Sequence, residues 1–323
     1  MLERLKGGRF LVIGRVGMDL TPMPEGTRTR EAHRMMVSMG GSSANIAAGL
    51  VRLGCGASLV TCVSDDAVGW YCEGQLDAFG IDRRHVRRVR GEERTSLALV
   101  EARVAEHQSV IYRNNAADFR MDVADVEAVD YARFDALITA GTVFAAEPSR
   151  SAAFRAFDLA RAGGLPVIFD IDYRPYSWPS PDVAADVLSR AGDKADVIVG
   201  NDEEFGFMAG GIDKGFAHAR ALAQKADIVI YKMGPRGAVT FADGGESRSG
   251  IYPVEALKPT GAGDSFMAGL IAGLSEGRPL AQAVARGSAC ASIVVARAGC
   301  AIAMPDRAAL DAFLATHPGQ TQG

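Results

Sequence analysis

The stretch PTGAGDSFMAGL, residues 259–270, predicts an apolar helix that begins at a turn of small residues. Apolar side chains follow at helical spacing, while Gly261, Ala262 and Gly263 leave the helix N-terminus almost bare. Unpaired backbone N–H groups at such an end attract an anion. Asp264 adds a carboxylate beside them. The stretch therefore indicates an anion site next to an acid, and a plain helix cap with flexible glycines is the alternative.

Two other phosphate-binding loops fit this sequence poorly. No G-x-x-x-x-G-K-[ST] run occurs in the chain. The dinucleotide pattern G-x-G-x-x-G needs a glycine where Phe266 stands, and it belongs after a first strand rather than near the C-terminus. The glycine turn therefore matches neither of these known phosphate-binding loops.

Composition excludes several classes of function. The 323 residues are 48% hydrophobic, and 35 basic against 39 acidic residues give a formal net charge of -4. Such a balance argues against a general nucleic-acid or membrane surface. The five cysteines form no C-x-x-C pair, so neither a disulfide framework nor a zinc site is expected. No signal peptide or membrane span is recognisable, so we expect a soluble cytoplasmic protein.

Short apolar runs alternate with helical segments along the chain. Residues 10–14, 57–63, 135–141, 166–172, 196–201 and 228–234 predict buried strands. Helical patterns at 43–53, 69–79, 151–162 and 216–225 lie between them. This alternation predicts an α/β fold with a mostly parallel sheet covered on both faces. Residues 21–39 and 95–113 break the rhythm, and we expect them to pair as a small sheet standing off the main one.

A second run of small residues opens another helix. In MGGSSANIAAGLVRLG, residues 39–54, Gly40 and Gly41 precede a helix with one apolar stripe. Small residues at a helix start let a ligand approach the backbone, and Asn45 could bond a hydroxyl group. A helix cap with small packing residues explains the same pattern equally well.

Four segments, in order along the chain, carry a family resemblance. They are GGSSAN at 40–45, NDEE at 201–204, KMGPRG at 232–237 and PTGAGDSFMAGL at 259–270. With them the chain resembles the ribokinase/PfkB family of carbohydrate kinases over nearly its whole length. The resemblance implies a ribokinase-like layered α/β fold with a mostly parallel central sheet and a small projecting β lid. It implies one domain over residues 1–323, with lid segments near residues 15–40 and 94–115.

The resemblance gives the glycine turn and the acid a catalytic meaning. In such kinases the turn, here Gly261, Ala262 and Gly263, is an anion hole, and the aspartate, here Asp264, is the base toward the sugar hydroxyl. The chemistry agrees, because an alcohol is a poor nucleophile until a carboxylate takes its proton. Convergent N–H groups then supply the electrostatic stabilisation on which phosphoryl transfer depends.

The resemblance also implies ATP and Mg²⁺ as cofactors. Glu204 would organise Mg²⁺ through water, although residues 202–204 also read as the acidic first turn of a helix. Ser288 stands where many relatives place an asparagine near the nucleotide base. The full set implied for the nucleotide is Asn201, Lys232, Gly234, Gly237, Thr260, Gly261, Gly263 and Ser288.

Two arginines narrow the range of sugar substrates that we expect. Arg113 ends SVIYR and Arg174 follows a strand in DIDYRPYSW, and an arginine fork suits a carboxylate or phosphate. A surface ion pair is the alternative for each. The residues implied for the sugar are Asp19, Gly40, Gly41, Asn45, Arg113 and Arg174.

Within the family, DIDYRPYSW, GNDEEF and ARAGCAIAMP are similar to the bacterial kinases of 5-dehydro-2-deoxygluconate in inositol catabolism. We therefore expect phosphorylation of the terminal hydroxyl of a keto-deoxy sugar acid. Kinases of 2-keto-3-deoxygluconate, fructose or nucleosides are alternatives, and a sugar- or nucleotide-binding protein without catalysis is the alternative from a different class. Expected partners are the sugar acid and ATP, with a homodimer through the lid and neither nucleic acid nor membrane.

Overall fold

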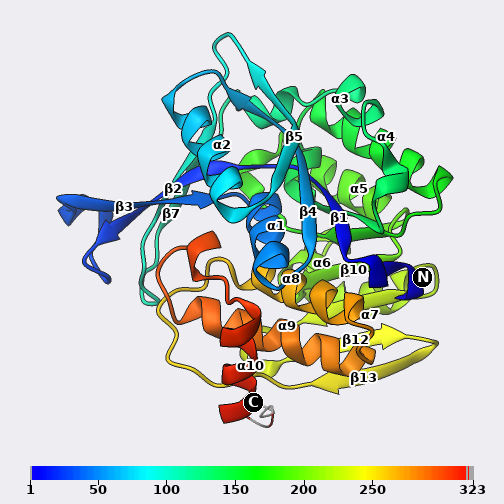
Figure 1. Cartoon of the computed structure of the whole chain (residues 1–323). Helices are drawn as coiled ribbons and strands as arrows, with labels where there is room; N and C mark the ends of the chain where they lie inside the picture. The colour runs from blue at the N-terminus through cyan, green and yellow to red at the C-terminus, as the bar shows by residue number, and fades with distance from the viewer. Residues whose placement is uncertain (1, 318, 320–323) are drawn as a thin grey trace.

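The computed structural model describes residues 2–317 and 319, and within them nine strands form one central sheet (Figure 1). Its order is β13-β12-β11-β10-β9-β8-β1-β4-β5. The strands are β1 Arg9–Ile13, β4 Gly56–Ser64, β5 Asp82–Val89, β8 Ala136–Ala140, β9 Val167–Asp170, β10 Val197–Asn201, β11 Ile228–Lys232, β12 Ala238–Ala242 and β13 Gly245–Ser249. All neighbouring pairs are parallel except β11–β12 and β12–β13, so the predicted mostly parallel sheet is confirmed.

Three strands of this sheet were not among the predicted elements. β5 reads DRRHVRRV, and its charged side chains hide the apolar signal of a strand at the sheet edge. β12 and β13 form an antiparallel hairpin at the opposite edge, where β13 is largely exposed. Edge strands tolerate charged side chains because one side of them faces solvent. The six continuous apolar runs, by contrast, all form interior strands of the sheet.

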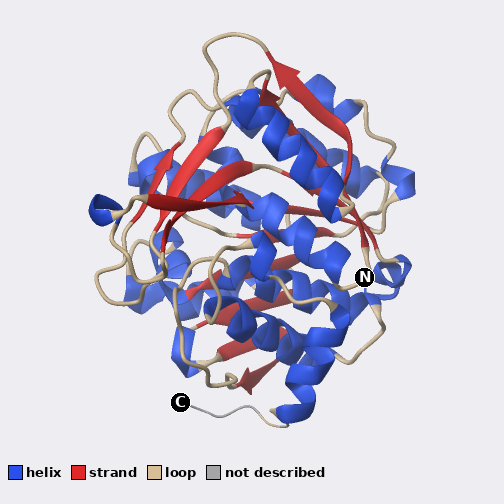
Figure 2. Cartoon of the chain, turned by 60° about the vertical axis from the view of Figure 1, so that its left-hand side comes forward, coloured by secondary structure: helices blue, strands red, loops and turns tan. Residues whose placement is uncertain are grey.

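Helices cover both faces of the sheet (Figure 2). Alternate strand residues point to opposite faces, so Phe10 and Val12 join one core while Leu11 and Ile13 join the other. The first core contains α1 Ser42–Arg52, α2 Ala67–Phe79, α8 Ala262–Ser275, α9 Leu280–Val295 and α10 Arg307–Thr316. The second contains α3 Val123–Glu127, α4 Ser149–Ala162, α5 Pro181–Gly192, α6 Asp202–Met208 and α7 Gly215–Leu222. None of the helices in the described part of the chain combines the length and apolarity needed to cross a bilayer.

A second sheet projects from the body. Its order is β3-β2-β6-β7, and its strands are β2 Gly17–Met23, β3 Arg34–Gly40, β6 Ser96–Val100 and β7 Ser109–Tyr112. β2 pairs with β6, which joins the two segments expected to form a small sheet. Figure 1 shows β2, β3 and β7 extending to the left of the central layers. The expected projecting sheet is therefore confirmed.

The topology determines where a ligand can bind. β1 lies between β4 and β8, and the chain fills the sheet outward from β1 first in one direction and then in the other. Ligands of open α/β sheets bind at the carboxyl ends of the strands, near such a reversal of strand order. Residues 141–142, 170–174, 201 and 232 all lie at this edge, since they end or follow β8, β9, β10 and β11.

Close packing of α1 on α8 brings the two glycine-rich helix starts together. A Cβ atom at Gly49 of α1 would lie 2.6 Å from the Cβ of Ala268 in α8, so only glycine permits this approach. The first turn of each helix then faces the other, and Asn45 reaches Asp264 across the contact.

Candidate active site

Asp264 lies in the first turn of α8 and contacts α1 directly. Asn45 Nδ2 donates a hydrogen bond of 2.7 Å to Asp264 Oδ2. Burial and the nearby charge of Asp172 raise the pKa of Asp264 to about 6, while Asn45, Arg174 and Lys232 oppose the shift. The carboxylate is therefore ionised at neutral pH and yet basic enough to accept a proton.

The glycine turn before Asp264 is shaped by its surroundings. Gly261 caps α8 with a φ of 84°, and a Cβ atom there would lie 3.1 Å from Val294 Cγ1 and 3.2 Å from Cys300 Sγ. At Gly263 a Cβ atom would instead face Lys232 Nζ at 3.5 Å. The turn thus presents its bare backbone toward a lysine at the end of β11, which is a suitable place for an anion.

Asp19 lies on the inner side of the projecting sheet. It is buried, and a Cβ atom at Gly40 would collide with its carboxylate. Burial raises the pKa of Asp19, against the opposing charge of Arg15. Ser38, the register partner of Asp19 on β3, was not predicted from the sequence as a site residue. A single serine in a strand gives no signal of its own.

Several buried oxygen atoms near Asp19 and Asp264 have no protein partner. Among the described residues, Asp19 Oδ1, Ser38 Oγ and Asn45 Oδ1 are buried and make no hydrogen bond. Unpaired buried polar atoms are costly, and in native proteins they are usually satisfied by water or a ligand. Two of the three are acceptors only, so they suit a ligand rich in hydroxyl groups.

The structure places Arg113 in a buried ion pair rather than at the surface. Its guanidinium pairs with Asp118, and Nη2 donates to the carbonyl oxygen of Thr142 at 3.1 Å. The guanidinium lies over the ring of Phe119, with 4.1 Å between Arg113 Cζ and the ring centroid. Arg113 Nε and Nη1 are buried without a partner. Part of its donor capacity is therefore unused.

Arg174 follows β9 and pairs with an aspartate of the same loop. Its Nη2 lies 2.8 Å from Asp172 Oδ1, and its side chain is 45% exposed. Asp172 also accepts a hydrogen bond of 2.5 Å from Ser42 Oγ at the start of α1. Although burial disfavours its charge, Arg174 and Ser42 hold the pKa of Asp172 below its ordinary value. Arg174 thus carries a half-exposed cation at the carboxyl edge.

Two acids at this edge were missed as site residues. Asp170 ends β9 and is buried, and a Cβ at Gly263 would lie 3.9 Å from its Oδ2. Burial raises the pKa of Asp170 well above its ordinary value, and Lys232 opposes this. Asp172 has a φ of 37°, which is uncommon for a residue other than glycine. The available signal was two acids in the IFDID stretch, directly at the end of an apolar run.

Asn201 and Glu204 form a capping box at the start of α6. The backbone N–H of Asn201 donates a hydrogen bond to Glu204 Oε2, and the backbone N–H of Glu204 donates one to Asn201 Oδ1. Both donor–acceptor distances are 2.8 Å. The expected acidic first turn is therefore present. Burial raises the pKa of Glu204, with Lys232 and Arg174 acting in the opposite direction. No cluster of three or more histidine, cysteine or acidic side chains fit to hold a metal occurs in the described part of the chain.

The residues implied for the nucleotide come from the ends of β10 and β11, the loop after β11, the start of α8 and the middle of α9. Gly234 and Gly237 have φ values of 56° and 79°, and a Cβ at Gly237 would collide with the Ser249 carbonyl oxygen. Ser288 Oγ donates to the carbonyl oxygen of Gly250 at 3.4 Å, so its hydroxyl bonds the backbone. Thr260 Oγ1 is buried without a partner.

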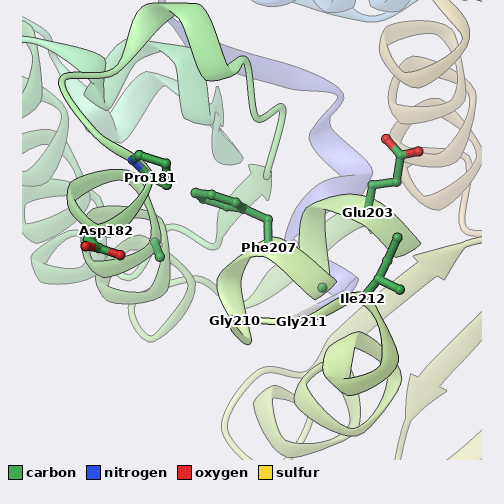
Figure 3. Close-up of a pocket in the computed structure, with 9 residues that line it drawn as sticks. Pro181, Asp182, Glu203, Phe207, Gly210, Gly211 and Ile212 are labelled. Carbon is green, nitrogen blue, oxygen red and sulfur yellow. The ribbon is translucent and has the colours of Figure 1, made fainter.

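A separate hollow lies between α5 and α6 (Figure 3). It has a volume of about 370 Å³, and Pro181, Phe207 and Ile212 contribute apolar side chains to it. The Phe207 ring stacks on Tyr173 with centroids 3.6 Å apart. None of the predicted site residues lines this hollow, so it is distinct from the cluster around Asp264.

Comparison with known proteins identifies the family of this chain. The model of the pfkB family carbohydrate kinases matches residues 9–307. The chain is 36% identical over 315 residues to a 5-dehydro-2-deoxygluconokinase of Geobacillus kaustophilus, covering 95% of this chain and 94% of the relative. It is also 36% identical over 314 residues to 5-dehydro-2-deoxygluconokinase 1 of Bacillus cereus, covering 95% of each. The chain therefore belongs to the pfkB family of carbohydrate kinases, as the resemblance implied.

Solved structures show the same fold. A PfkB protein from Polaromonas sp. matches with a TM-score of 0.81 at 28% identity, over 94% of this chain and 99% of that one. A fructokinase double mutant from Vibrio cholerae, in a form with fructose, ADP and potassium ion bound, gives a TM-score of 0.84 at 25% identity, over 95% and 98%. A Xylella fastidiosa fructokinase with bound ATP gives a TM-score of 0.85 at 20% identity, over 97% of this chain and 99% of that one. The expected ribokinase-like fold is thus confirmed.

Proposed function

We propose that this kinase transfers the terminal phosphoryl group of ATP to the terminal hydroxyl of 5-dehydro-2-deoxygluconate, giving its 6-phosphate. The observation that carries the proposal is the position of Asp264. Its carboxylate, with a pKa raised to about 6, adjoins a bare helix N-terminus and accepts a hydrogen bond from Asn45. Relatives 36% identical over almost the whole chain bear the name of this activity.

The residues around Asp264 suit each part of the transfer. Asp264 accepts the proton of the sugar hydroxyl, which makes the oxygen a nucleophile. The N–H groups of residues 261–263 stabilise the negative charge on the transferred phosphoryl group. Lys232 and Arg174 add positive charge, since both affect the pKa of Asp264. We therefore assign the base, the anion hole and both cations to one transfer site at the carboxyl edge of the sheet.

The carboxylates at this edge fit an ATP–Mg²⁺ complex. Asp170 and Glu204 are buried, and burial raises the pKa of each, so a neighbouring cation would stabilise their charged forms. Mg²⁺ usually keeps several water ligands and binds mainly to substrate phosphates, which agrees with the lack of a dense ligand cluster among the described residues. When bound, Mg²⁺ supplies charge neutralisation and aligns the phosphates. Glu204 would hold its water ligands.

The sugar would lie between Asp19 and Asp264. The unpaired oxygen atoms of Asp19, Ser38 and Asn45 would receive hydrogen bonds from its hydroxyl groups. Arg113 would attract the acid group, and Arg174 would lie between the sugar and the phosphates. Kinases of 2-keto-3-deoxygluconate, fructose or nucleosides remain the alternatives, and they differ in the charge and shape of the substrate.

The substrate assignment predicts a preference that one panel can measure. ADP release is followed with 5-dehydro-2-deoxygluconate, 2-keto-3-deoxygluconate, fructose and ribose. We expect the highest kcat/KM for the first. Arg113→Ala should raise its KM by about 10- to 150-fold, the contribution of one charge-assisted hydrogen bond, with the KM for ATP nearly unchanged.

Asp118→Asn is the matched control, because it breaks the same buried ion pair and keeps the guanidinium. It should change the sugar KM much less than Arg113→Ala. Equal effects of the two substitutions would reduce Arg113 to a structural role. A preference of the wild type for fructose or ribose would overturn the sugar-acid assignment and leave the kinase activity standing.

The raised pKa of Asp264 predicts how the rate depends on pH. A base with a pKa of about 6 is protonated and inactive at lower pH, so kcat should fall as pH drops through about 6. Asn45→Ala removes a donor that lowers this pKa, so the fall should begin at higher pH. The pH profiles of kcat for both proteins test this. If Asn45→Ala leaves the profile unmoved, the group that titrates is not Asp264.

We also propose that two copies of the chain pair through their projecting sheets. Leu20, Val37, Leu99 and Val110 are register partners across β2, β3, β6 and β7, so they share the face opposite Asp19. Val37 and Val110 are 45% and 47% exposed. An apolar row across a whole sheet is typical of an interface.

Sedimentation of the full chain tests the pairing. The wild type should sediment as a dimer, and Val37→Glu should sediment as a monomer because it buries a charge in the interface. Val104→Glu is the control, since Val104 is 58% exposed but lies outside the paired strands. A monomeric wild type at micromolar concentration would rule the dimer out.

A further inference from the structure

A buried lysine lies behind the glycine turn, and the proposed mechanism gives it no role. Lys258 precedes Thr260 by two residues, and its side chain is only 1% exposed. Lysine is almost never fully buried unless its ammonium group is paired, because burying a charge is costly. The contacts of this ammonium group therefore indicate its purpose.

The ammonium group of Lys258 joins two backbone carbonyls. It donates to the carbonyl oxygen of Thr260 and, at 3.4 Å, to that of Val294 near the end of α9. The backbone amides of Leu257 and Lys258 also donate to the Val295 carbonyl oxygen, at 2.8 and 3.1 Å. The segment before the turn is thus attached to α9 by both its backbone and its one buried cation.

The Thr260–Gly261 peptide connects this lysine to the anion hole. In a planar trans peptide the C=O and N–H groups point in opposite directions. Because Lys258 holds the Thr260 carbonyl, the N–H of Gly261 is directed away from the ammonium group. A charged donor on the carbonyl also polarises the peptide, which strengthens its N–H as a donor. The side chain of Val294 contacts the same turn, 3.1 Å from where a Cβ of Gly261 would lie.

The ammonium group interacts electrostatically with both acids of the proposed site. Burial lowers the pKa of Lys258, whereas Cys300, Asp264 and Asp19 act to raise it. Lys258 likewise opposes the rise that burial causes in the pKa of Asp19, although Arg15 does so more strongly. The charge of Lys258 is therefore favoured by both the proposed base and the proposed sugar ligand.

We propose that Lys258 is a positioning residue for phosphoryl transfer, whose ammonium group fixes the Thr260–Gly261 peptide so that the Gly261 N–H points at the transferred phosphoryl group. The inference rests on the proposed anion-hole role of residues 261–263. In this proposal the ammonium group of Lys258 acts as a built-in cation that two backbone carbonyl groups hold in place. Once its side chain is removed, a small cation from solution can occupy the same place.

Two substitutions and one added cation test the proposal. Lys258→Met should lower kcat by about 10- to 150-fold, the value of one charge-assisted hydrogen bond. The KM for ATP should change little, since the effect belongs to the transition state. Lys258→Ala leaves the carbonyls unpaired beside a cavity. Methylammonium chloride should restore part of its kcat, and tetramethylammonium chloride at the same ionic strength should not.

Arg286→Met is the matched control for loss of a buried cation. Arg286 lies in α9, is 5% exposed and pairs with Asp311 at 3.1 Å, away from the turn. The Arg286→Met substitution should lower the melting temperature of the protein without lowering kcat. If folded Lys258→Met keeps the wild-type kcat, or if methylammonium does not restore Lys258→Ala, the positioning role is wrong.

Lys258→Gln serves if the alanine variant does not fold, because its amide keeps an uncharged donor. A folded Lys258→Gln with reduced kcat supports the proposal, and one with the wild-type kcat contradicts it. Failure here is distinguishable from failure of the proposed function. An active Lys258→Met together with an inactive Asp264→Asn would overturn this inference alone, whereas an active Asp264→Asn would overturn the site itself.

Discussion

Asp264→Asn is expected to lower kcat by about 10²- to 10⁴-fold, the usual contribution of a general base. The substitution keeps the shape of the side chain and its place beside Asn45, but it removes the basic oxygen. Nucleotide binding should be largely retained, because the turn at residues 261–263 is unchanged. Steady-state turnover and titration of an ATP analogue measure the two effects separately.

Asp182→Asn is the control for this experiment. Asp182 also lies in the first turn of a helix, α5, but it is exposed and lines the separate hollow between α5 and α6. It should leave kcat unchanged. If Asp264→Asn kept more than about half of the wild-type turnover, no general-base role could be assigned to it.

Gly263→Ala is expected to lower kcat by about 10²-fold or more, as loss of one anion-hole donor does in other enzymes. The added methyl group would meet Lys232 Nζ at 3.5 Å and Asp170 Oδ2 at 3.9 Å, which are ordinary contact distances. The fold should therefore accept it. The methyl group would nevertheless occupy the space in front of the turn, where the phosphoryl group must approach the backbone. Thermal unfolding and turnover together show whether activity is lost without stability.

Two other glycines provide the comparison. Gly74 lies on the exposed side of α2, and among the described residues no atom outside its own helix would lie within 4 Å of a Cβ atom there. Gly74→Ala should therefore leave kcat unchanged and raise the free energy of unfolding by roughly 0.5–1 kcal/mol. Gly261→Ala should lose stability as well as activity, because its φ is 84°. A Gly263→Ala variant that retained wild-type kcat would show that the phosphoryl group does not approach this turn.

Much of the fold is predictable because the interior of a parallel sheet is continuous in apolar residues. The runs at 10–14 and 228–234 form β1 and β11 for this reason. The helix starts at 42 and 262 follow from small residues ahead of an apolar stripe. β5 could not be predicted in this way, because its sequence DRRHVRRV has no apolar run. Its arginines instead form ion pairs with acids elsewhere in the chain, such as Arg87 with Asp125 and Arg88 with Glu73.

The candidate site is less predictable because it is assembled from residues far apart in the chain. Asn45 and Asp264 are 219 residues apart, and only the packing of α1 on α8 explains their contact. Ser38 matters only through its register with Asp19, and the role of Lys258 depends on the end of α9. A linear pattern contains none of these relations, whereas it does contain the spacing within each helix start.

The most direct test of the central claim is to identify the product by phosphorus NMR. The wild-type chain is incubated with ATP, Mg²⁺ and 5-dehydro-2-deoxygluconate, and ADP is measured in the same sample. The account predicts one phosphomonoester whose signal couples to the two protons of a terminal CH₂ group, formed in equal amount to ADP and absent with Asp264→Asn. Binding of the sugar acid without any phosphomonoester, or release of inorganic phosphate alone, would contradict it.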